Sequence, residues 1–196
     1  MLLSNGNLLL EHGATDVGEF LLHAYQQLGV NYPKFYKMDR LSKLALIACE
    51  VLFDGSTSSP LDPLTTAVVL TNSHSSLDAD VRYNESIDRI PSPALFVYTL
   101  PNIMIGEICI KHGFKGENAM FVFDQFNADF LHRYVTDLLD NSGMTSCICG
   151  WVDVYNNDYK AVLYLVSITE EEKSAIPFTK DNIQNIYDKK HGEVNV

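Results

Sequence analysis

The sequence has few basic residues, and its charge is strongly one-sided. Its 196 residues include 14 Lys and Arg against 25 Asp and Glu, so the formal net charge is −11. A protein that binds nucleic acid needs a basic surface to neutralise phosphates. The charge balance therefore argues against nucleic acid as a partner and is typical of a cytoplasmic protein.

Long apolar runs are also missing. A helix that spans a bilayer needs roughly 20 predominantly apolar residues, and no stretch of this chain approaches that length. The first residues, MLLSNGNLLLEHG, have no basic start and are interrupted by Asn5, Gly6 and Asn7, so they make a poor signal peptide. We expect no membrane span and a cytoplasmic location.

Cysteine is scarce as well. The four cysteines are Cys49, Cys109, Cys147 and Cys149, and each lies in an apolar run, which favours buried, reduced thiols over disulfides. A one-residue spacer separates Cys147 from Cys149 without a second pair elsewhere. We therefore interpret them as alternate positions on one strand face rather than as a zinc or redox motif. Without a compact His, Cys and carboxylate cluster in the sequence, we predict no metal and no cofactor.

Hydrophobic residues make up 46% of the chain, enough for one sizeable core, so we predict a single domain over residues 1–196. Helical spacing of apolar residues and buried, β-branched runs alternate along the chain. We predict helices over 16–28, 39–53, 100–112, 127–139 and 179–188, and strands over 66–71, 119–123, 146–155 and 160–167. The last two strands read as a hairpin, which indicates an α/β fold with a mixed central sheet flanked by helices.

The run from Pro93 to Leu139 resembles the part of the β-ketoacyl synthases that leads up to the catalytic nucleophile. In that family a Pro-Asn pair opens a long helix, a Lys-Gly turn and a buried strand follow, and a strand-to-helix elbow carries the catalytic Cys. The matching residues here are Pro101, Asn102, Gly106, Gly113, Lys115 and Gly116. The resemblance is strongest over 32–167 and implies a layered half of the thiolase-like condensing-enzyme fold.

The elbow itself departs from the family. It carries Asp124, Gln125 and Phe126 and no Cys, with Gln125 at the position expected for the nucleophile. A condensing enzyme needs a thiolate to accept an acyl group, and a Gln amide cannot replace it. The resemblance instead points to the chain-length-factor subunits of polyketide synthases, which carry Gln there. We predict a helix cap at Asp124 and a pocket formed by Gln125, Phe126 and Asn102.

A second departure concerns histidine. The family uses two His residues and a Lys from a later part of the chain, in a His-Gly-Thr-Gly-Thr loop and another His-containing loop. The six histidines here, at positions 12, 23, 74, 112, 132 and 191, match neither loop. We expect His112 and His132 to be solvated or near helix ends. Both departures predict a truncated pseudo-ketosynthase rather than an enzyme.

The loop NSHSSLD suggests a second, different site. It places Ser73, His74, Ser75, Ser76 and Asp78 in one short segment, the residue types of a hydrolase triad. Neighbours in sequence rarely point together, and a triad is assembled by the fold. We therefore expect a structural or substrate-gating role for this loop.

The resemblance also implies a dimer interface, because the family pairs the strand before the nucleophile with its twin. That strand here comprises Ala119, Met120, Phe121, Val122 and Phe123. It is short, apolar and free of Pro and charge, which suits edge pairing. We expect a homodimer, or a heterodimer with a full-length ketosynthase.

Three functions remain open from the sequence. The first is a non-catalytic partner or scaffold for an active β-ketoacyl synthase in fatty-acid, polyketide or polyene biosynthesis. The second is an acyl-thioester enzyme, a decarboxylase or acyltransferase, of altered mechanism. The third is a module that binds an acyl chain or the arm of an acyl carrier protein, although the net charge of −11 disfavours docking of that acidic carrier.

Overall fold

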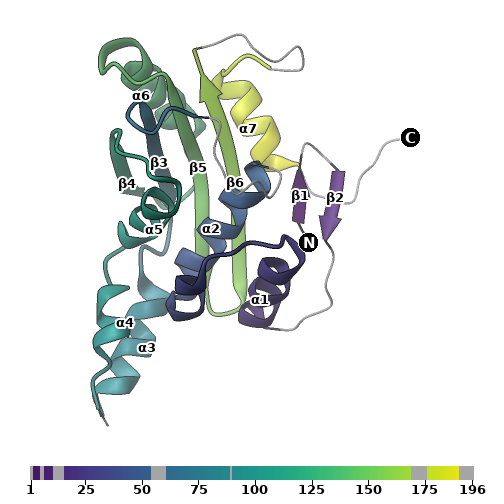
Figure 1. Cartoon of the computed structure of the whole chain (residues 1–196). Coiled ribbons are helices and arrows are strands. Elements are labelled where there is room, and N and C mark those ends of the chain that lie inside the picture. Colours follow the sequence, from purple (N-terminus) through teal and green to yellow (C-terminus); the bar gives the residue numbers. More distant parts are fainter. Residues whose placement is uncertain are drawn as a thin grey trace.

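The computed structural model describes residues 2–4, 7–10, 16–53, 61–88, 90–168 and 176–189, with side chains from residue 16 onward. Its centre is a mixed four-stranded sheet in the order β4-β3-β5-β6 (Figure 1). The strands are β3 Thr66–Asn72, β4 Asn118–Val122, β5 Ser146–Tyr155 and β6 Asp158–Ser167. β3 runs parallel to β4 and β5, and β6 pairs antiparallel with β5. The predicted α/β class and the hairpin are confirmed.

The hairpin depends on two unusual backbone positions. Asn156 has a φ of 56° in the turn, a conformation that Asn tolerates better than most residues. Gly150 has a φ of 149° within β5, and a Cβ there would overlap the Val162 carbonyl oxygen on β6. Only glycine allows the two strands to approach in this way.

One face of the sheet is covered by helices that precede β4 in the sequence. They are α1 Val17–Gln27, the 3-10 helix η1 Pro33–Lys37, α2 Arg40–Leu52 and α5 Ile103–His112. Asp16 caps α1 by accepting from Gly18 N and Glu19 N. The core on this side joins Leu44 and Ile47 of α2 to Val68 and Leu70 of β3.

The opposite face is covered by α6 Ala128–Asn141 and α7 Lys180–Asp188. Ala67 and Val69 of β3 point to this side, because successive residues of a strand face opposite ways. They pack with Leu131 and Val135 of α6. A strand buried on both faces explains why β3 reads as a continuous apolar run rather than as an alternating one.

Two short helices and a small sheet complete the described structure. α3 Leu77–Ile87 and α4 Pro93–Val97 project away from the sheet (Figure 1). β1 Leu2–Ser4 and β2 Asn7–Leu10 form an antiparallel pair. Neither α4 nor this pair was predicted, and the predicted helix over 100–112 begins only at Ile103. None of the helices in the described ranges is both long and apolar enough to cross a membrane.

Candidate functional site

The loops that follow β3, β4 and β5 lie at one edge of the sheet, because these three strands are parallel. Phe123 N, just after β4, donates to Asn72 O at the end of β3 at 2.9 Å. In open α/β sheets ligands bind at the carboxyl ends of the strands. The predicted elbow and the NSHSSLD loop therefore both lie at the edge where a site is expected.

The elbow is a loop rather than a sharp turn. Asp124 and Gln125 are exposed, and α6 begins only at Ala128. Asn127 caps the helix, since its Oδ1 accepts from Phe130 N at 2.9 Å. The predicted cap at Asp124 is wrong, because three residues separate Asp124 from the first helical residue. In the described structure the cap bond to the first amides of α6 comes from Asn127 and not from Gln125.

An open depression of about 480 Å³ lies at this loop. Gln125 and Phe126 line it, as the predicted pocket requires, but Asn102 does not: it occupies the N-cap position of α5. The opposite wall comes from α7, through Lys180, Asp181 and Gln184. The sequence predicts a helix there, but its polar pattern does not indicate where that helix packs.

Aromatic rings fill the space behind the elbow. Phe126 stacks on Tyr187 of α7 with ring centroids 4.0 Å apart, and Trp151 of β5 meets Phe126 edge-on at 6.0 Å. The Lys160 ammonium lies 3.4 Å from the centroid of Tyr187. The Trp151 ring narrows the room beside the elbow.

The cysteines lie away from this edge. Cys49 is on α2, Cys109 on α5, and Cys147 and Cys149 at the start of β5, all as free thiols, as the sequence predicts. Burial raises the pKa of the Cys109 thiol to about 11 and raises the pKa of Cys49 and Cys149 as well. The thiolate is the nucleophilic form. None of these side chains can substitute for a nucleophile at the elbow.

β4 forms one end of the sheet, and none of the described strands pairs with its outer edge. Val122 is 50% exposed, while Ala119, Met120 and Phe121 are half-buried. Phe121 contacts Phe130 and Tyr134 of α6 edge-on, with centroids 4.8 and 4.9 Å apart. The predicted interface strand is therefore an apolar edge strand beside an aromatic cluster.

No family model and no curated protein matches the sequence. Solved structures do match. One is "The ishigamide ketosynthase/chain length factor", with a TM-score of 0.57, 24% sequence identity, and coverage of 68% of this chain and 39% of that chain. Another is a ketosynthase (ApeO) in complex with its chain length factor (ApeC) from Xenorhabdus doucetiae, with a TM-score of 0.55, 16% identity, and coverage of 84% and 76%.

The chain has the ketosynthase fold. The predicted thiolase-like layering is therefore confirmed. The chain spans 39% of the length of the ishigamide protein that it matches.

The ketosynthase-like chain should be almost inert to thiol reagents. With a pKa of about 11, roughly one Cys109 thiol in 10⁴ is ionised at pH 7, and Cys49, Cys147 and Cys149 are fully buried. We expect intact-mass spectrometry after iodoacetamide treatment at pH 7 to show unmodified native chain and four alkylations after denaturation in guanidinium. Fast alkylation of one thiol in the native chain would reveal a reactive cysteine and contradict the conclusion that none of the four thiols can act as a nucleophile.

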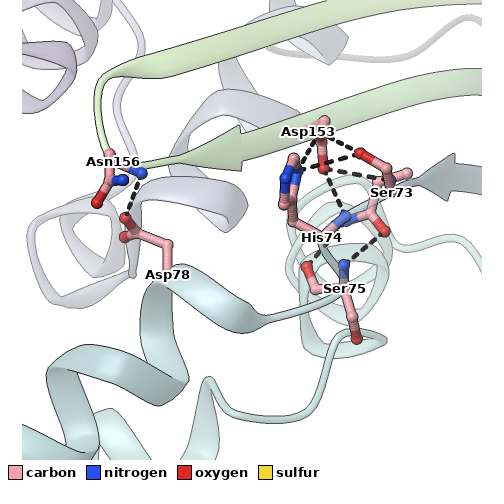
Figure 2. Close-up of polar contacts among 7 residues, drawn as sticks. Ser73, His74, Ser75, Asp78, Asp153 and Asn156 are labelled. Carbon is pink, nitrogen blue, oxygen red and sulfur yellow. Dashed lines mark hydrogen bonds and ion pairs between the residues drawn. The ribbon is translucent and has the colours of Figure 1, made fainter. Parts of the chain in front are cut away.

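The loop after β3 brings Ser73 and His74 against Asp153 of β5 (Figure 2). His74 Nδ1 lies 2.7 Å from Asp153 Oδ2, and Ser73 Oγ lies 2.8 Å from the same oxygen and 3.0 Å from Nδ1. The backbone N–H groups of Ser73 and His74 both donate to Asp153 Oδ1. One carboxylate at the end of β5 therefore binds this loop at four points.

This arrangement is not a serine-hydrolase triad. In a triad the carboxylate binds Nδ1 of the His and the serine binds Nε2, whereas here both partners meet Nδ1. Asp78, the acidic residue of NSHSSLD, lies elsewhere and accepts from Asn156 N at 3.2 Å (Figure 2). Sequence reasoning missed Asp153. An Asp inside the otherwise apolar strand SCICGWVDVY was the signal that could have indicated it.

His112 is the last residue of α5, so the prediction that it lies near a helix end is confirmed. Its side chain is only 1% exposed, however, and it packs between Phe53 and Phe114. Its Nε2 lies 2.9 Å from Glu50 Oε1, which also binds Lys111 Nζ at 2.7 Å. This buried ionic cluster joins α2 to the end of α5. It stabilises the helical layer, away from the elbow depression.

Proposed function

We propose that this chain is a non-catalytic ketosynthase-like subunit that pairs with an active, full-length β-ketoacyl synthase in the cytoplasm. The observation that carries the proposal is the elbow at the carboxyl edge of the sheet. It exposes Gln125 where the resemblance to the synthases places the nucleophilic Cys, while the four thiols lie elsewhere. A chain without a thiolate at that position cannot take an acyl group from a thioester there.

The fold and the unpaired outer edge of β4 both support a ketosynthase as the partner. The Xenorhabdus doucetiae structure is of a ketosynthase in complex with its chain length factor, so this fold occurs in a pair of that kind. The β4 edge leaves backbone groups that a strand of the partner can satisfy. Besides Val122 on β4, large apolar side chains are exposed on α5, on α4 and between these helices: Ile110, Leu100, Val97 and Phe96. Fatty-acid, polyketide or polyene biosynthesis is the pathway class we assign.

Co-expression with the full-length β-ketoacyl synthases of the source organism tests the proposal. We expect the tagged chain to co-purify with one of these enzymes and native mass spectrometry to show a one-to-one complex. We also expect condensation of malonyl-carrier substrate by the enzyme to depend on the chain. A monodisperse monomer that binds no ketosynthase and leaves the activity unchanged would refute the role.

The depression beside Gln125 favours a second function, binding of a carrier arm. Its volume of about 480 Å³ and its mixed lining suit a flexible polar chain such as phosphopantetheine. Titration with pantetheine should show weaker binding for Gln125→Ala than for the control variant Asn141→Ala, an exposed site at the far end of α6. Equal affinity of both variants for pantetheine would refute a carrier-arm site at Gln125.

A further inference from the structure

A second cleft lies at the same edge of the sheet and shares no lining residue with the elbow depression. Its volume is about 200 Å³, and it lies between the loop after β3 and the β5–β6 turn. The lining residues are His74, Asp153, Tyr155, Asp158, Tyr159 and Lys160. The proposed subunit role uses none of these side chains, and the size suits a small substituent rather than a whole cofactor.

His74 is held with one ring nitrogen available. Its Nδ1 binds Asp153 Oδ2 at 2.7 Å, and its ring stacks on Tyr155 with centroids 5.0 Å apart. The side chain is 40% exposed, and no described residue binds Nε2. A carboxylate on Nδ1 keeps the proton there and leaves the lone pair of Nε2 facing outward. This is the form in which imidazole acts as a general base.

The loop that carries His74 is rigidly held. Asp153 binds it at four points, as described above, and is only 14% exposed. Asn72 braces the same loop, since its Nδ2 donates to Ser75 O at 2.9 Å and its Oδ1 accepts from Ser75 N at 3.0 Å. Ser75 itself has a φ of 52°, a conformation that a non-glycine residue adopts only under such constraint. The imidazole is thus positioned before any ligand arrives.

Lys160 supplies a positive charge on the other side of the cleft. Its ammonium donates one hydrogen bond to Tyr187 O at 3.0 Å, and an ammonium has three donors. The remaining donors can stabilise negative charge that develops on a bound carbonyl oxygen. Asp153 and Asp158 are the acidic groups of the lining, so the cleft combines a base and a cation with two carboxylates.

We propose that this cleft is an acid–base site that hydrolyses short acyl esters with water as the nucleophile. The water oxygen attacks the ester carbonyl carbon while His74 Nε2 accepts the water proton. The oxyanion is stabilised by the Lys160 ammonium. The bond from carbon to the leaving oxygen then breaks, and His74 returns the proton to that oxygen. The products are a carboxylic acid and an alcohol. Asp153 is a positioning residue, because it acts through His74.

The purified full chain tests this inference with p-nitrophenyl acetate as the probe. We expect kcat/KM to fall about 100-fold in His74→Gln, the lower range for loss of a general base. His132→Gln, which alters a half-buried histidine on α6, should retain the wild-type rate. Asp153→Asn should lower kcat more than it changes KM, since the carboxylate that fixes the tautomer of His74 is gone.

Two further measurements separate chemistry from misfolding. Thermal melting followed by circular dichroism should show that His74→Gln remains folded. Nitrogen-15 NMR of the wild-type chain should show the proton of His74 on Nδ1, and Asp153→Asn should lose this preference because the carboxylate that holds the proton there is gone. A wild-type rate no higher than that of folded His74→Gln would overturn the proposal. So would an Nε2-protonated His74. Either result leaves the subunit role unaffected, because that role depends on β4 and Gln125.

Discussion

Val122→Pro should disrupt the complex with the ketosynthase, whereas Val122→Ala should leave it intact. The expected loss is about 3 kcal/mol, or roughly 100-fold in Kd, because proline removes a backbone donor and places its ring at the pairing edge. Val122 is half exposed, so the alanine variant removes little packing. Comparison of the two variants isolates the backbone contribution.

The register of β4 explains the choice of residue. Val68 N donates to Glu117 O, and Phe123 N donates to Asn72 O, on the side that faces β3. Backbone groups of a strand alternate between its two edges. Those of Asn118, Met120 and Val122 therefore face the free edge. Proline at one of these positions removes no hydrogen bond of the β3–β4 ladder.

Size-exclusion chromatography and biolayer interferometry with the co-expressed ketosynthase measure this effect. Circular dichroism of Val122→Pro controls for its fold. If the proline variant binds the ketosynthase as tightly as the alanine variant, the partner does not use the β4 edge, and the interface must be sought on α4 and α5.

Lys111→Met should destabilise the chain by about 3–5 kcal/mol, the usual cost of leaving a buried charge with one partner fewer. Glu50 is fully buried, and its Oε1 binds both Lys111 and His112, while its Oε2 has no hydrogen-bond partner in the described structure. The methionine has a similar length but no charge. The remaining contact to His112 cannot compensate for the lost ammonium unless that imidazole becomes charged.

Arg133→Met is the matched control. Arg133 and Asp129 form an ion pair at 2.7 Å on the outer surface of α6, with side chains 71% and 56% exposed. Exposed pairs contribute about 0.2–1 kcal/mol. Equilibrium denaturation in guanidinium chloride should separate the two variants clearly. The double variant Glu50→Leu, Lys111→Met should recover most of the loss. Equal destabilisation by Lys111→Met and Arg133→Met would show that Lys111 contributes no more to the free energy of unfolding than a residue of an exposed ion pair.

Local patterns predicted much of the fold. The helix after Asp16, the buried strand β3 and the hairpin of β5 and β6 follow from spacing, capping and turn residues that lie within about ten positions of one another. The cap of α6 was predicted wrongly, because Asp124 and Asn127 are both good caps and only the course of the loop decides between them.

By itself, the sequence determined the order of the four strands of the central sheet and of most helices, the α/β class and the absence of a thiol at position 125. These properties depend on residue identity and on periodicity along one element. Only the tertiary structure decided which distant side chains meet: Asp153 with His74, Glu50 with Lys111 and His112, and Tyr187 of α7 with Phe126. Periodicity indicates which face of an element is buried, but the side chains that meet there depend on how the elements pack.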